Sequence, residues 1–348
     1  MSFEEHPARP RKKKKRTGRA IVLSVLALVM VAALVAAGYL WNLGRTFDSE
    51  SQTITDAFPA EETRPEVNDE SKDAVNILLL GSDTRATREA DEDSEDFGTL
   101  PNGGRSDTMM LVHIPADREN VFVTSVMRDT WLDIPGVGTA KINRAFASGG
   151  VPKAVETLEG LFGVRINHVA SVDFEGFKGL TDAVGGVTVN NPRGFKQSIV
   201  NGMYFPEGVQ TLDGEQALAF VRERKSFPGS DYERVKNQQL FVKALLGQLM
   251  SKETLTNPGK VSEVVSQIAP FIAVDETLDS GKVASYASSM LNLRSSDMEF
   301  FTLPNQGPGR SADGQSIVIP DMEVIEKFGK ALQEDKMAEF VETTDLSR

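Results

Sequence analysis

An uncharged run of 25 residues near the N-terminus constrains this chain more than any other feature. It extends from Ala20 to Gly44. An α-helix of that length, at about 1.5 Å per residue, exceeds the roughly 30 Å hydrocarbon core of a bilayer. Tyr39 and Trp41 stand near its C-terminal end, where aromatic rings favour the membrane interface. The run therefore predicts a transmembrane helix over residues 20–43.

The charges around this run predict its orientation. Residues 1–19 contain eight Lys or Arg against two Glu, although the whole chain has a net charge of -12. A basic tail over residues 1–19 predicts a cytoplasmic N-terminus, and so a single-pass protein of the cell membrane with an extracytoplasmic body. A cleaved signal peptide is the alternative, but its apolar core is usually only about 7–15 residues long.

Composition excludes several classes of site. The chain has no cysteine, which excludes disulfides, thiolate metal sites and a catalytic thiol. The body that follows the basic tail is strongly acidic, and binding to nucleic acid needs a basic surface, so we expect no nucleic-acid partner. His113 and His168 alternate with apolar residues in strand-like segments, which favours structural roles over metal binding.

The composition and apolar pattern of successive segments predict one folded domain. Residues 44–74 are rich in Asp, Glu, Ser and Thr without an apolar period, which predicts a flexible acidic linker. Strand-like and helix-like segments then alternate over residues 75–335, and residues 336–348 are predicted to form a tail. The segments "TMMLVHI" and "VFVTSVM" predict a hairpin. The fold class indicated is α/β, with a central mixed β-sheet flanked by helices on both faces.

Arginines and aspartates stand at the ends of these predicted elements. They are Asp83, Arg85, Arg105, Asp107, Arg128, Arg222 and Arg224. Ligands of open α/β sheets bind where strands end, so we expect these side chains to converge. Guanidinium groups match phosphate oxygens, and carboxylates are ligands for Mg²⁺ (or Mn²⁺). The pattern indicates phosphoryl transfer by positioning and charge neutralisation at a phosphate or pyrophosphate site.

Each of these residues also has a structural explanation. Asp83 can end its strand in an Asx turn, and Arg105 with Asp107 can form a surface ion pair. Arg128 can pair in the same way with the adjacent Asp129. Only the joint occurrence of such pairs at strand ends favours the functional interpretation.

Three further polar residues share one face of a predicted helix. Asp231, Arg234 and Gln238 have the spacing i, i+3, i+7. Asp231 can cap this helix, or the whole face can line the phosphate site. Lys141 and Asn143, at a loop-to-helix junction, fit a structural and a ligand-binding role equally well.

Seven ordered motifs together resemble the LytR-CpsA-Psr family of cell-envelope phosphotransferases. They are VNILLLGSDTR, RSDTMMLVHI, VTSVMRDTWLDIPG, KINRAFASGG, VDFEGFKGLTDAVGGVTV, LDGEQALAFVRER and SDYERVKNQQ. They cover about residues 75–250, and a weaker pattern extends the resemblance to about residue 335. One departure is visible: the family often has an arginine immediately before the last motif's first glutamine, where this chain has Asn237.

The resemblance implies a membrane-anchored phosphotransferase. Such an enzyme moves a glycopolymer from a polyprenyl pyrophosphate lipid carrier to peptidoglycan through a phosphodiester link. It implies Asp83 and Asp107 as Mg²⁺ ligands and, with Arg128, as catalytic residues. The pyrophosphate would be held by Arg105, Arg128, Arg222, Arg224 and Gln238, with Arg85 a weaker candidate. Asp231 and Arg234 are implied as supporting residues, and Lys141 and Asn143 are supporting candidates from their position in the sequence.

Two other functions fit the same residues. Water in place of the sugar acceptor would make the chain a lipid pyrophosphate hydrolase. A non-catalytic envelope protein that binds glycolipid or regulates wall assembly is the other alternative. A pure binder, however, has no need for Asp83 and Asp107 beside the phosphates.

Overall fold

The computed structural model of the chain describes residues 42–83, 105–198, 202–227, 231–251 and 257–346, together with Gly38. Its description of side chains does not include Ser82, Asp83, Arg105, Ser106, Asp107 and Pro258. The predicted transmembrane helix over residues 20–43 falls almost wholly outside these ranges. Among the helices that are described, none combines the length and the apolar character needed to cross a bilayer.

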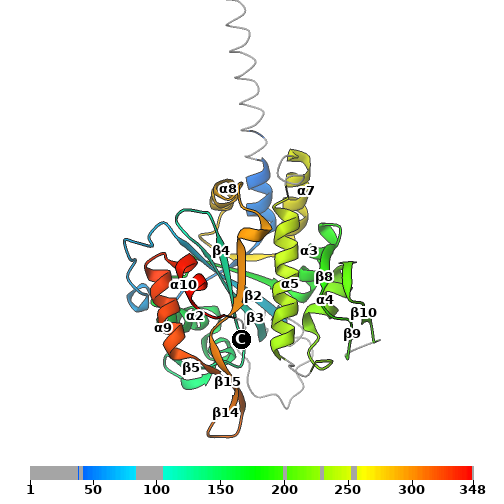
Figure 1. The fold of residues 1–348 in the computed structure, drawn as a ribbon. Helices are drawn as coiled ribbons and strands as arrows, with labels where there is room; N and C mark the ends of the chain where they lie inside the picture. The colour runs from blue at the N-terminus through cyan, green and yellow to red at the C-terminus, as the bar shows by residue number, and fades with distance from the viewer. Residues whose placement is uncertain are drawn as a thin grey trace, which may run out of the picture.

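A seven-stranded mixed sheet forms the centre of the fold, in the order β1-β12-β7-β2-β3-β4-β13 (Figure 1). Its strands are β1 (Gln52–Ile54), β2 (Val75–Asp83), β3 (Arg105–Ile114), β4 (Val121–Val126), β7 (His168–Asp173), β12 (Ala273–Asp275) and β13 (Met298–Thr302). Strand β2 pairs antiparallel with β3 and parallel with β7. Strands β3 and β4 are antiparallel neighbours, so the hairpin predicted from the sequence is confirmed.

Both faces of this sheet are covered by helices. One face packs against α2 (Asn143–Phe162), α9 (Met322–Gln333) and α10 (Met337–Thr343), and the other against α5 (Asp231–Leu249) and α8 (Ser280–Ser289). Successive side chains of a strand point to opposite faces. Leu78 and Leu80 of β2 therefore enter the first core, while Ile77 and Leu79 enter the second. Burial on both sides explains why β2 is a continuous apolar run.

Helix α2 contains a break near its N-terminal end. It begins at Asn143 and changes direction at Gly149 and Gly150. Gly150 has φ 64° and ψ -152°, a conformation open in practice only to glycine. The helix ends at Gly163, which adopts the left-handed conformation common after helix C-termini.

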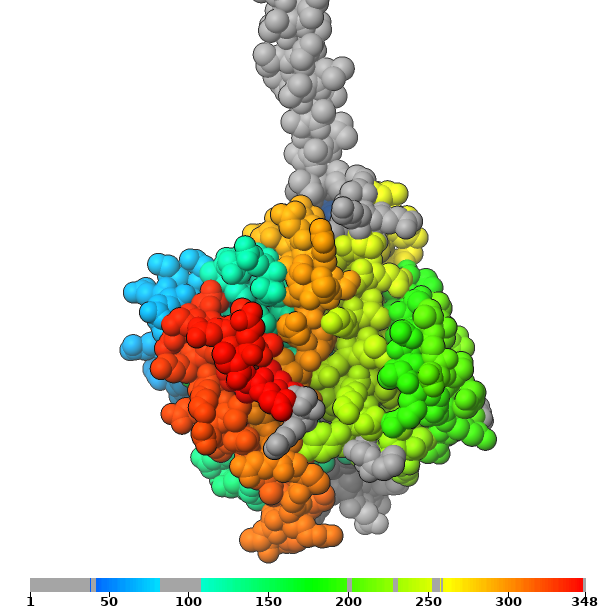
Figure 2. All heavy atoms as spheres, viewed as in Figure 1, coloured from blue at the N-terminus to red at the C-terminus, as the bar shows by residue number. Residues whose placement is uncertain are grey.

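Smaller elements surround the sheet. The helices are α3 (Phe174–Ala183), α4 (Gly214–Arg222) and α7 (Pro258–Ile268), with short 3-10 turns at Glu61–Thr63, Ala269–Phe271 and Ser295–Asp297. Four hairpins or ribbons pair β5 (Trp131–Ile134) with β6 (Gly138–Lys141), β8 (Val187–Asn191) with β11 (Gly208–Leu212), β9 (Phe195–Lys196) with β10 (Tyr204–Phe205), and β14 (Asn305–Arg310) with β15 (Ser316–Pro320). The β14–β15 hairpin projects from one end of the molecule (Figure 2).

The segment predicted to be a flexible linker is packed onto the domain. Residues 42–50 are helical, and Phe47 is only 8% exposed in a small apolar cluster with Val274. The carboxylate of Asp48 accepts hydrogen bonds of 2.8 Å from both the backbone N–H and the hydroxyl of Ser280. Strand β1 then pairs in parallel with β12 as an edge of the central sheet.

A buried ion pair ties the end of this segment to the core. Arg64 Nη2 lies 2.6 Å from Glu159 Oε1, and the Glu159 side chain is 1% exposed. The same carboxylate accepts from the backbone N–H of Ile166 at 2.8 Å. The prediction of a flexible linker over residues 44–74 is therefore wrong. It was based on an acidic, hydroxyl-rich composition, which gives no sign of a three-residue strand or of a partly buried arginine paired with a distant glutamate.

The predicted tail over residues 336–348 also differs from the structure. Helix α10 places Met337 at 0% and Phe340 at 6% exposure in the same core as α9. The domain therefore continues through this helix.

The two histidines of the domain have structural roles, as predicted. His113 Nδ1 lies 2.8 Å from Asn76 Oδ1. His168 lies between Asp275, which is 3.1 Å from its Nδ1, and the Tyr286 hydroxyl, 3.0 Å from its Nε2. Burial raises the pKa of Asp275, but hydrogen bonds, first of all from His168, outweigh this and hold the pKa at about 2.

Candidate functional site

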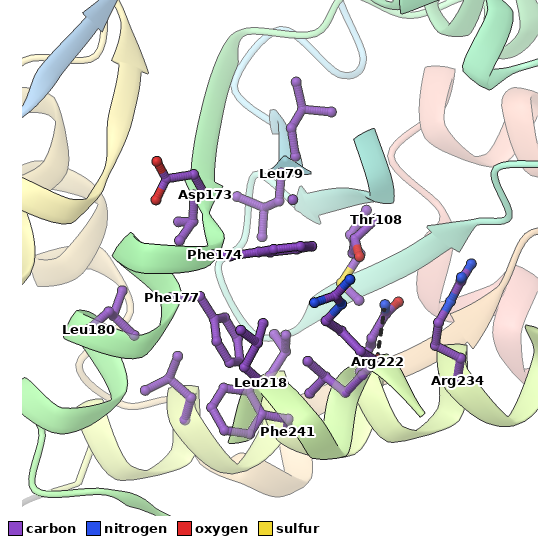
Figure 3. A pocket seen from close by; sticks show the side chains of 18 of the residues that line it. Leu79, Thr108, Asp173, Phe174, Phe177, Leu180, Leu218, Arg222, Arg234 and Phe241 are labelled. Carbon is purple, nitrogen blue, oxygen red and sulfur yellow. Dashed lines mark hydrogen bonds between the residues drawn. The ribbon is translucent and has the colours of Figure 1, made fainter. Parts of the chain in front are cut away.

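A cavity of about 380 Å³ lies between the sheet and helices α3, α4 and α5 (Figure 3). Most of its wall is apolar, and the residues of that wall are Leu79, Leu80, Gly81, Met110, Ala170, Val172, Phe174, Phe177, Leu180, Leu218, Val221, Phe241, Val242, Leu245 and Leu246. Its polar lining residues are Thr108, Arg128, Asp173, Arg222, Arg224, Arg234 and Gln238.

Helix α5 shows how the two kinds of wall are arranged. Arg234, Gln238, Phe241 and Leu245 follow one another at intervals of three or four residues, so they share one face of the helix. From Arg234 to Leu245 the helix rises about 16 Å. In Figure 3, Arg222 and Arg234 lie at one side, and the rings of Phe177 and Phe241 lie at the other. The cavity therefore has a cationic end and an apolar end.

Arg222, the last residue of α4, is held against an aromatic ring. Its guanidinium carbon lies 4.3 Å from the centroid of Phe174, the first residue of α3. A cation over the face of a ring is attracted by the ring's quadrupole. The chain then becomes extended at Glu223 (φ -67°, ψ 132°), and both Arg222 and Arg224 line the cavity.

Asp231 lies between two of the arginines. Its Oδ2 is 2.9 Å from Arg234 Nη2, and its Oδ1 is 3.8 Å from Arg224 Nη1. Arg234 is 5% exposed and Asp231 is half-buried. A carboxylate in this position fixes both guanidinium groups and reduces their mutual repulsion. Of the polar helix face predicted from residues 231, 234 and 238, Arg234 and Gln238 line the cavity, whereas Asp231 is not a lining residue and contacts the arginines that are.

Arg128 enters the cavity from the end of β4. Its Nε is 3.8 Å from Asp129 Oδ2, and Lys141 Nζ is 3.1 Å from Asp129 Oδ1. Asn143 donates a backbone hydrogen bond of 3.2 Å to the carbonyl of Arg128. Neither Lys141 nor Asn143 is among the lining residues of the cavity, so the structure places both behind Arg128.

The predicted metal ligands lie on two paired strands at the cavity's edge. Asp83 of β2 is opposite Arg105 of β3. The register shifts between the Ser82–Ser106 and Gly81–Thr108 pairs, so Asp107 is the extra residue on β3. Gly81 and Thr108, which pair beside them, line the cavity. The side chains of Asp83, Arg105 and Asp107, and the whole of Arg85, lie outside the described residues.

Mg²⁺ usually takes one or two carboxylates together with phosphate oxygens and water, so Asp83 and Asp107 stay predicted ligands by residue type and by the strands that carry them. Among the residues whose side chains are described, no group of three His, Asp or Glu is arranged to hold a metal ion. Asp83 and Asp107 fall outside that search.

Sequence reasoning missed two residues beside the cavity, Phe174 and Glu223. Phe174 directly follows β7 and so stands at a strand end. It was missed because only polar residues were considered at such positions. Glu223 stands between the two arginines of the motif and was passed over for them. A third residue at this wall, Asp173, caps α3 by accepting from the Gly176 N–H at 2.6 Å. Its carboxylate points away from the arginines in Figure 3.

Asn237 is not a wall residue of the cavity. It is 7% exposed, and its Nδ2 donates a 3.3 Å hydrogen bond to the carbonyl of Phe220. Its neighbour Gln238 donates in the same way to the carbonyl of Val221, at 3.4 Å. The one position where the motifs depart from the family pattern therefore supports the end of α4 and makes no contact inside the cavity.

Comparisons with known proteins agree with these motifs. The model of the LytR_cpsA_psr family matches residues 42–334. Cell wall biosynthesis protein LcpA of Corynebacterium glutamicum is 29% identical over 287 residues, which are 73% of this chain. The chain spans 55% of the length of LcpA.

The alignments with two further relatives extend over most of each relative's length. The polyisoprenyl-teichoic acid–peptidoglycan teichoic acid transferase TagU of Enterococcus faecalis is 29% identical over 90% of this chain and 95% of its own. The crystal structure of B. subtilis TagV has a TM-score of 0.63 at 25% identity and covers 76% of this chain and 98% of that one. The chain therefore belongs to the LytR_cpsA_psr family, as its seven motifs predicted.

Proposed function

We propose that this chain is a phosphotransferase that moves a glycopolymer from a polyprenyl pyrophosphate carrier to peptidoglycan. Membership of the family supports this, and so does a relative named as a polyisoprenyl-teichoic acid–peptidoglycan teichoic acid transferase. One observation carries the proposal: a single cavity joins a cationic end to an apolar wall. A polyprenyl pyrophosphate has the matching form, with an anionic head and a hydrocarbon tail.

The cationic end fits a pyrophosphate group. Arg128, Arg222, Arg224 and Arg234 all line it, and planar guanidinium groups donate in pairs to phosphate oxygens. The apolar wall has a different task. The polyprenyl tail already lies in an apolar environment while it is in the bilayer. The apolar wall of the cavity replaces that environment when the tail binds. Affinity and specificity then come mainly from the head group.

The reaction breaks the bond between the two phosphates. The acceptor hydroxyl attacks the phosphorus that carries the glycopolymer, a new P–O bond forms, and polyprenyl monophosphate leaves with the bridging oxygen. The hydroxyl proton passes to a base. The arginines of the cavity stabilise the charge that develops on the bridging and leaving-group oxygens. A Mg²⁺ (or Mn²⁺) ion bound by Asp83 and Asp107 would supply further neutralisation of the phosphate oxygens.

The proposal places this chemistry outside the cell membrane. The uncharged run over residues 20–43 would anchor the chain as a single-pass protein, and the basic tail would keep the N-terminus in the cytoplasm. A cysteine introduced by Ser2→Cys should then be protected from a membrane-impermeant thiol reagent in intact cells, while Ser226→Cys, an exposed site, should react. The opposite labelling pattern would reverse the topology.

The function is tested with the full chain in a mild detergent. Its substrates would be a short glycan on a polyprenyl pyrophosphate and a peptidoglycan fragment, with Mg²⁺. We expect a phosphodiester-linked product and polyprenyl phosphate. Removing Mg²⁺ with a chelator, or Asp83→Ala, should abolish both. Arg222→Ala should lower kcat/KM about 10²-fold or more, as loss of a preorganised charge donor does elsewhere.

A matched control is Lys225→Ala, which removes the same charge from an exposed residue three positions from Arg222. We expect this variant to retain wild-type rates. Glycan phosphate released to water, without a linked product, would instead identify a hydrolase. Binding of the lipid without turnover, unchanged by Asp83→Ala, would identify a non-catalytic binder.

A further inference from the structure

A buried carboxylate separates the two arginines that follow α4. Glu223 has an exposed fraction of 0%. Because the chain is extended there, its side chain points to the opposite side from Arg222 and Arg224, which both line the cavity. A fully buried charge is costly unless it is compensated by hydrogen bonds, so its partners show what it does.

Four hydrogen bonds compensate this carboxylate. Oε2 accepts from the backbone N–H of Ser198 at 2.7 Å, and Oε1 accepts from the Ser198 hydroxyl at 2.8 Å. Oε1 also accepts from the backbone N–H groups of Arg224 at 3.0 Å and Ser226 at 2.9 Å. Burial raises the pKa of Glu223, but the hydrogen bonds from Ser198 and Ser226 outweigh it, so the net shift is downward and the group is ionised at neutral pH.

These contacts point to a structural task for Glu223. Oε1 accepts three of the four bonds and Oε2 accepts one, and every donor belongs to the backbone or side chain of Ser198, Arg224 or Ser226. Glu223 is fully buried and is not among the lining residues of the cavity. What the contacts do is wrap residues 223–226 around one carboxylate and tie them to the segment after β9.

The other side of the same backbone is also held. The last carbonyls of a helix lack partners within the helix. At the end of α4, those of Phe220 and Val221 accept from the side chains of Asn237 and Gln238. The backbone that carries Arg222 and Arg224 is thus fixed from α5 on one side and from Ser198 on the other, with Glu223 as the contact on the second side.

We propose that Glu223 is a positioning residue of the phosphate site, which holds Arg222 and Arg224 in the orientation that binds the head group. The inference rests on the proposed function of the cavity and extends it to a residue that does not touch the substrate. An arginine pair that is ordered beforehand loses less conformational freedom when the ligand arrives. Glu223 therefore acts on the binding of the pyrophosphate through the backbone of its two neighbours.

The test uses Glu223→Gln in the full chain. Glutamine has the same size but no charge, and it presents an NH₂ group where Glu223 presents an oxygen, so one donor of the loop faces another donor. We expect KM for the lipid pyrophosphate to rise about 10-fold or more, with a smaller change in kcat, which corresponds to at least about 1.4 kcal/mol of binding. Ser198→Ala removes one of the four bonds and should have a smaller effect in the same direction.

Two controls separate positioning from mere stability. Glu159→Gln changes another buried carboxylate that is tied to Arg64 and lies outside the cavity lining. It should lower the melting temperature and leave the kinetic constants of the folded protein unchanged. In an Arg222→Ala/Arg224→Ala background, Glu223→Gln should have almost no further effect on kcat/KM, because residues that act through one another are not additive.

Two results would overturn the proposal. One is a Glu223→Gln variant that melts earlier, as Glu159→Gln does, but keeps the wild-type KM. The other is a Glu223→Gln effect that persists in full without the two arginines. If the wild type shows no turnover, the proposed function fails separately, and direct binding of a fifteen-carbon polyprenyl pyrophosphate still tests Glu223: we expect the same loss of affinity, and equal affinity would contradict it.

Discussion

The ring of Phe174 offers the sharpest test of how the cavity orders its arginines. It lies 4.3 Å from the guanidinium carbon of Arg222, which is half-buried. Phe174→Leu keeps an apolar side chain of similar size and removes the π face. The change therefore removes the stacking contact while leaving most of the packing at the start of α3.

The magnitude follows from the contact. A cation over an aromatic ring contributes about 0.5–1 kcal/mol at exposed sites and about 2 kcal/mol when desolvated. A half-buried Arg222 lies between these limits. Free energies in that range correspond to a roughly 2- to 30-fold change in a binding constant. We expect KM for the lipid pyrophosphate to rise within this range and kcat to change less, because Arg222 would have to be ordered when the ligand binds.

Steady-state kinetics with a donor of fixed chain length would measure both constants. Phe174→Tyr is the matched control, because it retains the ring face, and its KM should stay close to that of the wild type. Equal KM values for Phe174→Leu, Phe174→Tyr and the wild type would show that the stacking contact does not order Arg222. An equal rise in both variants would assign the effect to packing.

Two further predictions concern stability. Arg64→Ala leaves the buried carboxylate of Glu159 without its ion-pair partner, so urea denaturation should show a free energy of unfolding lower by about 3–5 kcal/mol. Arg165→Ala is the control, because its partner Glu61 is exposed, and it should cost at most about 1 kcal/mol. Similar losses for the two variants would contradict the assignment of Arg64 and Glu159 as a buried pair. Asp275 has a pKa of about 2 against an ordinary 3.8, so its contribution is present above about pH 4 and is lost as the pH falls towards 2. That difference amounts to about 2 kcal/mol, and Asp275→Asn should flatten this part of the stability–pH curve; a curve as steep as that of the wild type would refute the linkage.

The sequence predicted the parts of the fold that carry a long apolar pattern. Strand β2 was recognisable because burial on both faces makes it continuously apolar, and α5 because its polar residues recur at helical spacing. Strand β1 was not recognisable, since three residues are too few to show a period. The pairing of Arg64 with Glu159 joins residues 95 positions apart, and no local pattern indicates such a contact.

The same distinction applies to the site. The convergence of Arg128, Arg222 and Arg224 on one cavity could be predicted, because each stands at the end of an element of an α/β fold. The partners of these arginines could not. Phe174 and Glu223 act through contacts that depend on how α3 and the segment after β9 pack against α4. Residue type and spacing alone do not contain that information.

The docked helix over residues 42–50 has a consequence for how the cavity is presented. A flexible tether limits only how far a domain can move from its point of attachment. A docked helix also fixes the orientation of the domain relative to that point. Phe47 and Asp48 fix this helix beside α8. The C-terminal half of α5 and helix α8 contribute side chains to the same apolar cluster. The cationic end of the cavity lies at the other end of α5, about 18 Å away along its axis from Arg234 to Leu246. A partner joined rigidly to residue 42 would therefore lie closer to the apolar end of the cavity than to its cationic end. A rotation of that partner would turn the arginines by the same angle.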